Sequence, residues 1–467
     1  MDTKVTLETS ATVTPAISLH HDSPGESIEM TVLNQSQNGE TQSELPKSIA
    51  GVEDDPAAVR REMIAMASVC WTQFMAGWND GTLGPLIPTI QQHFNIGFIT
   101  VSMLFVSACA GYVTGAVAVI HLTDKFGFGR VLIAGSLCQI VAYTILSAAP
   151  PFPVMCATLV INGIGMSFQN AQTGGMVVSL TRNPGTKMGL LHAGYGAGAC
   201  VSPLISTQFT QIPRWSFYFL ASLGLAISNT IFQSLVFGFR TLPEILASFG
   251  IPEVVHTADA TRTSKYRQIL SLRIIYVLAF FALLYVGTEV TIGGWIVTFL
   301  IENRGGGTSA GYVSSGFFAG LMLGRLVLIW VNQKIGERRA VYLYSCIIIG
   351  LEFVIWFTPS LILNAVAVSF VGLLLVFKFK LGCGFWCPQA MIQSVLSDSH
   401  ETDWRLLTGA ISLIASSGMS GSAIFPFITG VMAQKRGVQV LQPLIVGLLG
   451  MIVITWALIP RIGKKGD

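Results

Sequence analysis

Long apolar segments alternate with short polar ones from Met63 almost to the end of the chain. A helix of about 20 apolar residues crosses the hydrocarbon core of a bilayer, which is about 30 Å thick. Twelve segments meet this requirement, and each is predicted to form a transmembrane helix. Their expected ranges are 63–90, 98–122, 130–149, 153–180, 188–210, 215–239, 272–300, 309–332, 340–358, 361–396, 405–432 and 440–460.

The polar segments divide the chain into parts. Residues 1–59 are rich in Ser, Thr, Gln and acids and poor in apolar residues, which predicts a disordered cytosolic tail. The longest connection separates six helices from six. We therefore expect an N-terminal six-helix bundle at 60–240, a cytosolic linker at 241–271, a C-terminal six-helix bundle at 272–460 and a cytosolic tail at 461–467.

Composition and charge support a membrane protein. Hydrophobic residues make up 52% of the chain and charged ones 11%, whereas soluble proteins carry about 25% charged residues. The net charge of +3 is too small to indicate a nucleic-acid partner. Lys and Arg gather in the loops on the side of both termini, so both termini are expected in the cytosol. We expect the plasma membrane rather than the vacuole, and a monomer.

No enzyme motif accompanies the apolar segments. The sequence has no Gly-rich phosphate loop, no nucleophile turn and no zinc-binding helix, so we expect neither catalysis nor a cofactor. Cys383 and Cys387 have three residues between them, but without a His or a second Cys pair they do not favour a metal site.

Three features recur 209 positions apart, which indicates duplicated halves. Small residues four apart in such a repeat let transmembrane helices approach closely. Parallel repeats are typical of transporters whose binding site lies between the halves. The repeated features are Asp80 with Glu289, the pair Gly111 and Gly115 with Gly320 and Gly324, and Asp124-Lys125-Phe126-Gly127 with Gln333-Lys334-Ile335-Gly336.

The Asp124–Gly127 loop, with its weaker copy at 333–336, resembles the loop signature of the major facilitator superfamily, and the resemblance covers residues 60–460. It implies an all-α membrane protein with twelve transmembrane helices in two six-helix pseudo-repeat bundles. In that superfamily the loop packs against the other bundle and stabilises the outward-facing state. The gating residues implied here are Asp124, Lys125, Gly127, Arg130, Lys334, Gly336 and Arg338.

The segment Trp78-Asn79-Asp80, followed by two prolines, is similar to the first helix of the fucose permease group of sugar/proton symporters. The run from Tyr285 through Glu289 to Trp295 is similar to helix 7 of fungal relatives of that group. The chain also departs from these patterns. Gln333 replaces the acid of the second loop, and the acid that follows Gly-x-Gly in helix 4 is missing after Gly165.

Asp80 and Glu289 are therefore the candidate proton carriers. Charged groups inside the membrane are costly and usually functional. A carboxyl group removed from water favours its neutral form, so each acid could take up and release a proton. The alternative is that each one only locks helix packing. His192 is a further candidate for proton relay, or a histidine at the membrane surface.

Polar and aromatic residues near the acids are candidate ligands of a small polar solute. Sugars need convergent hydrogen-bonding groups and an apolar plate. The candidates are Asn79, Asn162, Gln169, Tyr195, Tyr285, Trp295 and Arg325. Helix packing remains an alternative for the amides and Trp295, and an ion pair for Arg325.

The tenth apolar segment is too long for one helix and contains Lys378 and Lys380, which suggests an insertion around Val376–Trp386. We expect a transporter that moves a small polar solute, favouring a sugar, by alternating access across the lipid bilayer with coupling to protons. The alternatives are a drug or metabolite exporter of the same fold and a membrane nutrient sensor that does not transport.

Overall fold

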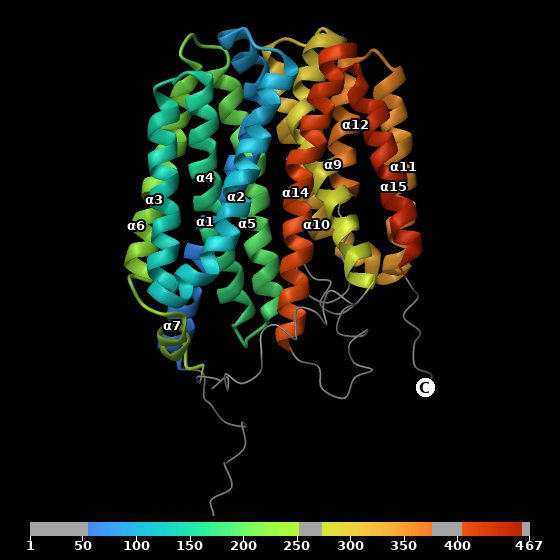
Figure 1. The fold of residues 1–467 in the computed structure, drawn as a ribbon. Helices are drawn as coiled ribbons and strands as arrows, with labels where there is room; N and C mark the ends of the chain where they lie inside the picture. Colours follow the sequence, from blue (N-terminus) through green and yellow to red (C-terminus); the bar gives the residue numbers. More distant parts are fainter. Residues whose placement is uncertain (1–54, 252–272, 376–403, 460–467) are drawn as a thin grey trace, which may run out of the picture. The chain divides into compact units, whose positions relative to one another are not determined.

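The computed structural model describes residues 55–251, 273–375 and 404–459, and their regular structure is helical. Nine of the helices in these ranges are long and apolar enough to cross a membrane. The long helices, drawn in Figure 1, are α1 (Pro56–Phe94), α2 (Phe98–Phe126), α3 (Phe128–Ser147), α4 (Phe152–Val178), α5 (Pro184–Phe209), α6 (Tyr218–Val236), α9 (Arg273–Arg304), α10 (Tyr312–Ile335), α11 (Glu337–Phe357), α12 (Leu361–Leu374), α14 (Trp404–Arg436) and α15 (Leu441–Leu458).

These twelve helices match the predicted segments closely, apart from their ends. The first helix begins at Pro56, seven residues before the predicted start, because Asp55 caps it. The Asp55 side chain accepts a hydrogen bond from the Ala57 N–H at 3.0 Å, and Pro56 suits the first turn of a helix. A capped, charged first turn extends α1 beyond its apolar part.

The predicted tenth segment corresponds to α12, which ends at Leu374. Its second part, the suspected insertion at Val376–Trp386 and the cysteines Cys383 and Cys387 lie outside the described residues. The predicted domain boundaries stay predictions. The described part of the predicted linker, residues 241–251, contains the short helix α7 (Leu242–Ser248), whose Ile245 packs with Phe128 and Phe237.

Equivalent helices pack in the same pairs in the first six and the last six. The pairs are α1 with α5, α2 with α4 and α3 with α6, and correspondingly α9 with α14, α10 with α12 and α11 with α15. The repeated glycines make equivalent contacts, because Gly111 lies against Val160 of α4 and Gly320 against Ser369 of α12. The repeat predicted from the sequence is therefore also a repeat of packing.

The turns after α2 and α10 share one backbone conformation. Gly127 has φ +81° and Gly336 has φ +86°, and each glycine ends one helix and begins the next. L-residues with a side chain rarely adopt this conformation, which explains why glycine stands at both positions.

The first six and last six helices approach each other closely at the far end, opposite to where α1 begins and α15 ends (Figure 1). There the Gly84 backbone lies against that of Gly293, and Gly430 lies against Ser102. Cys109 Sγ donates to the Met419 carbonyl nearer the middle of α2 and α14. Beyond Cys109, towards the termini end, α2 has a hollow on its surface, and Val117 there is 67% exposed.

Candidate functional site

Asp80 lies in the middle of α1, yet its side chain is exposed. Two close crossings hold α1 on α5. Gly77 touches the Tyr195 carbonyl group, and Gly198 touches that of Phe74. These crossings bring the Tyr195 hydroxyl to Asp80, where it donates a hydrogen bond of 2.6 Å to Oδ2. Asp80 is thus an exposed acid in the middle of a long helix.

Tyr195 links this acid to the second half of the chain. The guanidinium carbon of Arg325 on α10 lies 5.4 Å from the centroid of the Tyr195 ring, within the range of a cation–π contact. Arg325 Nη2 lies 3.6 Å from Glu289 Oε1 on α9. The four residues Asp80, Tyr195, Arg325 and Glu289, which we call the acid network, therefore connect α1, α5, α10 and α9.

The two acids differ in their surroundings. Glu289 and Arg325 are buried, with side chains 7% and 8% exposed, so each charge compensates the other in a poorly solvated place. Asp80 has hydrogen-bond donors from neutral groups, Tyr195 and Asn79. For Arg325 the sequence left a substrate contact and an ion pair open, and the structure has the ion pair.

Asn79 joins three polar side chains next to Asp80. Its Oδ1 accepts hydrogen bonds from Asn162 Nδ2 at 2.6 Å and from the Tyr143 hydroxyl at 3.3 Å, and its Nδ2 lies 3.4 Å from Asp80 Oδ1. The predicted residues Asn79 and Asn162 are thus brought together. Tyr143 was missed, because one aromatic residue in an apolar segment gives no signal of its own.

Gln169 and His192 lie farther from the acids. Gln169 is 2% exposed and packs on Gly135 of α3, which places it between helices of the first half. His192 is half-buried on α5, three residues before Tyr195. Ligand and relay roles for these two residues stay predictions.

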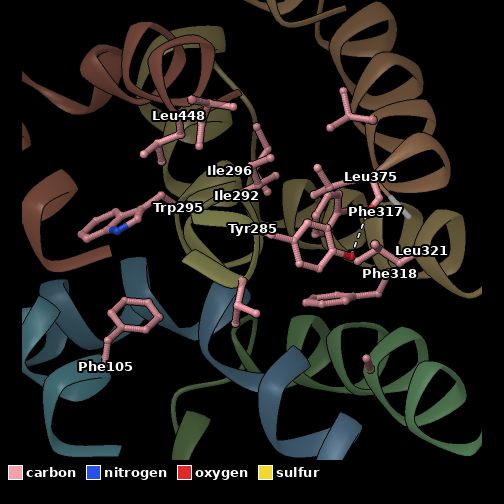
Figure 2. Packing of buried hydrophobic residues seen from close by; sticks show 14 of the residues in the cluster. Phe105, Tyr285, Ile292, Trp295, Ile296, Phe317, Phe318, Leu321, Leu375 and Leu448 are labelled. Carbon is pink, nitrogen blue, oxygen red and sulfur yellow. Dashed lines mark hydrogen bonds between the residues drawn. The ribbon is translucent and has the colours of Figure 1, made fainter. Parts of the chain in front are cut away.

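Tyr285 and Trp295 are buried in this conformation, as Figure 2 shows. The Tyr285 hydroxyl donates to the Leu375 carbonyl at 2.8 Å. Trp295 Nε1 donates to the Pro426 carbonyl at 3.0 Å, and the ring lies 5.9 Å from that of Phe98 and 6.4 Å from that of Phe105. Trp295 therefore helps to hold the two halves together at the far end, and it has no exposed face to offer a ligand here.

The predicted gating residues lie at the termini end. Asp124, Lys125 and Arg130 are at least partly exposed, and the loop is anchored within the first half by a 3.0 Å hydrogen bond from the Gly129 N–H to the Arg240 carbonyl. In the second half Lys334 is exposed, and Arg338 Nη2 donates to the Ala457 carbonyl of α15 at 3.4 Å. Gating by either loop stays a prediction.

The sequence matches the family model described as Major Facilitator Superfamily over residues 69–405. It is 27% identical over 413 residues to Bypass of stop codon protein 6 of Saccharomyces cerevisiae, covering 85% of this chain and 82% of that protein. It is 24% identical over 239 residues to Sodium-dependent glucose transporter 1 of Xenopus laevis, covering 47% and 48%.

Solved structures share the fold. The D-xylose-proton symporter has a TM-score of 0.67, covering 86% of this chain and 98% of that one, and a mutant of the nucleoside transporter NupG has 0.64, covering 85% and 100%. A bacterial homologue of the human lysosomal transporter Spinster, in an inward-facing and unoccupied conformation, has 0.62, covering 85% and 96%. All three are 11% identical in sequence, which supports the fold and no more.

Proposed function

Because this chain belongs to the major facilitator superfamily and is a membrane transporter, we propose that it carries a small polar solute of the sugar class together with protons. The observation that carries the proposal is the acid network. It places an accessible carboxyl group, a hydroxyl group and a buried ion pair where helices of the two halves meet.

The proposed cycle starts from Asp80. In this conformation its carboxyl group is exposed and accepts a hydrogen bond from the Tyr195 hydroxyl, and in the proposed cycle it takes up and releases a proton. Arg325 contacts both Tyr195 and Glu289. A change of charge on Asp80, which Tyr195 contacts, would therefore alter the Arg325–Glu289 ion pair in the second half. A proton on Glu289 would weaken its pair with Arg325 and allow the halves to change their packing.

The solute would bind beside this network. The amide of Asn79 and the hydroxyl of Tyr195 provide donors and acceptors on the same side as Asp80, as hydroxyl-rich ligands require. The glucose and xylose transporters named among the similar proteins support the sugar class. We further propose a monomer in the plasma membrane with both termini in the cytosol.

Reconstituted vesicles test this function. In vesicles with a pH gradient, the parent protein is expected to accumulate a radiolabelled sugar from a panel of hexoses and pentoses. Asp80→Asn and Glu289→Gln should each abolish accumulation of the sugar against its concentration gradient. Glu302→Gln, which changes an exposed acid at the end of the same helix α9, serves as the control and should transport normally.

Two outcomes would contradict the proposal. Uphill transport by correctly inserted Asp80→Asn and Glu289→Gln proteins would remove both acids from proton coupling. Binding of a sugar without flux of any solute would instead favour a membrane sensor.

A further inference from the structure

A line of buried polar side chains leads from Asn79 into the core of the first six helices. Tyr143 and Gln139 lie one turn apart on α3, while Asn162, Gln169 and Thr173 share one face of α4 at helical spacing. From Asn162 to Gln169 the line advances about 10 Å along α4, away from Asp80 and towards the termini end. We call these five residues the polar file.

The two helices meet closely along this line. Gly135 of α3 and Gly165 of α4 lie backbone to backbone. A β-carbon at Gly165 would lie 3.4 Å from Gln139 Cγ, and one at Gly135 would lie 3.0 Å from Gln169 Cγ. The side chains of Gln139 and Gln169 therefore lie at the same crossing of α3 and α4.

Several polar atoms of the file have no hydrogen-bond partner among the described residues. These atoms are Asn162 Oδ1, both Nε2 and Oε1 of Gln139, and Gln169 Nε2. The three residues are 1%, 0% and 2% exposed. Buried polar groups without a protein partner are normally satisfied by ordered water, since leaving them unsatisfied costs free energy.

The file continues beyond the orphaned atoms. Thr173 Oγ1 donates to the Gln169 carbonyl at 2.8 Å and accepts from Gln73 Nε2 of α1 at 3.0 Å. Thr173 lies five residues before Val178, the last residue of α4 at the termini end. Polar groups thus follow one another from the level of Asp80 to near the end of the helix.

We propose that internal water molecules along the polar file carry protons between Asp80 and the termini end of the first six helices. This path rests on the proposed role of Asp80, and it shares Asn79 with the proposed solute site. In the described residues it joins Asp80 through Asn79, whose Nδ2 lies 3.4 Å from Asp80 Oδ1, long for a hydrogen bond. Both residues lie on α1, so a rotation of either side chain connects or separates the path, and it does not conduct throughout the cycle.

Radiolytic footprinting of the parent protein in lipid nanodiscs tests the water directly, because hydroxyl radicals formed at bound water label the residues beside it. Tyr143 and Met166, a buried residue between Asn162 and Gln169 on α4, should be labelled despite being 2% and 6% exposed. Tyr218 is the control, since it is fully buried and its hydroxyl is partnered by Thr82 and Ser202. If Tyr143 and Met166 are labelled no more than Tyr218, the proposal is wrong.

Transport of D-glucose, with a pH-sensitive dye inside the vesicles, tests the role of the Gln139 amide, which is not among the candidate solute ligands. The variant Gln139→Leu should lose labelling of Tyr143. Its proton-driven accumulation should fall several-fold, whereas sugar exchange at equal pH on both sides should stay as in the parent. Gln442→Leu replaces a buried glutamine of α15, outside the file, and should change neither rate.

Equal loss of accumulation and exchange in Gln139→Leu, or labelling of Tyr143 unchanged by it, would make Gln139 a packing residue and overturn the proposal. If Asp80→Asn abolishes accumulation while Gln139→Leu accumulates normally, the path is wrong and the proposed function stands. If Asp80→Asn accumulates normally, the proposed function itself is wrong. The footprinting of the parent tests for the water even if Gln139→Leu does not fold.

Discussion

Arg325 and Glu289 form a buried ion pair in the second half of the molecule. Removing one member of such a pair leaves an uncompensated charge, which typically costs about 3–5 kcal/mol. Asp80, in contrast, is exposed and is stabilised by neutral donors. The two acids, although equivalent in the repeat, therefore respond differently when their neighbours change.

Replacement of Arg325 should show this difference. Arg325→Met leaves Glu289 buried without its cation and is expected to destabilise the protein by about 3–5 kcal/mol. Arg325→Met/Glu289→Gln removes both charges and should recover most of that loss. Thermal unfolding of the purified proteins in detergent measures both effects. An Arg325→Met protein as stable as the parent would contradict the buried ion pair.

Tyr195 offers a second test, because its hydroxyl and its ring make different contacts. Tyr195→Phe removes the hydrogen bond to Asp80 and keeps the ring near Arg325, so transport should slow while stability falls by about 1 kcal/mol. Tyr195→Leu also removes the cation–π contact and should lose a further 0.5–2 kcal/mol, roughly. Equal transport by Tyr195→Phe and the parent would remove the hydroxyl from the mechanism.

The sequence identified Asp80, Glu289, Tyr195 and Arg325 one by one, because polar side chains in apolar segments are conspicuous. It could not show which of these side chains contact one another. The pairing depends on which faces of α9 and α10 meet, and these faces follow from packing across the whole molecule. For Trp295 the sequence left helix packing open as an alternative, but it could not show that Phe98 and Phe105 of α2 contact the ring.

For the helices as elements, glycine decides how closely they can cross. The apolar segments predicted the positions of the twelve helices well, and nine of the helices in the described residues are long and apolar enough to cross a membrane. Helix ends were less well predicted where a cap such as Asp55 extends the helix into the polar region. The α1–α5 crossing illustrates what packing adds, since there a glycine of each helix touches a carbonyl group of the other.

Gly198→Ala should therefore destabilise the protein strongly. Its new methyl group would overlap the Phe74 carbonyl oxygen, which is backbone and can move only if α1 moves. Gly224→Ala on α6 is the control, because nothing lies within 4 Å of its β-carbon position. Expression level and unfolding temperature measure the effect. A Gly198→Ala protein as stable as Gly224→Ala would contradict the close crossing.

At the scale of the whole transporter, the two ends of the helices differ. The first and last six helices are held together at the far end by backbone contacts, such as Gly84 with Gly293, and by the aromatic contacts of Trp295. Asp80 in the middle remains exposed. We infer that this conformation is closed at the far end and gives access to Asp80 from the termini end.

Cysteine labelling tests this conformation. Asp80→Cys should react with a small, membrane-impermeant methanethiosulfonate reagent added on the side of the termini. Ser314→Cys is the matched position at the far end, where the residue is fully buried beside Gly84, and it should react slowly from either side. Faster reaction of Asp80→Cys from the opposite side would show that the resting protein opens the other way.

The two glycines with positive φ, Gly127 and Gly336, also provide information about the history of the gene. After a duplication, each copy accumulates substitutions independently, and at this loop the acid of one copy stands opposite Gln333 in the other. The charged residue of the loop can be replaced without loss of the turn. The glycine cannot easily be replaced, because other residues rarely adopt its backbone conformation. Ancestry between such halves is therefore better traced through turns of this kind than through charged residues.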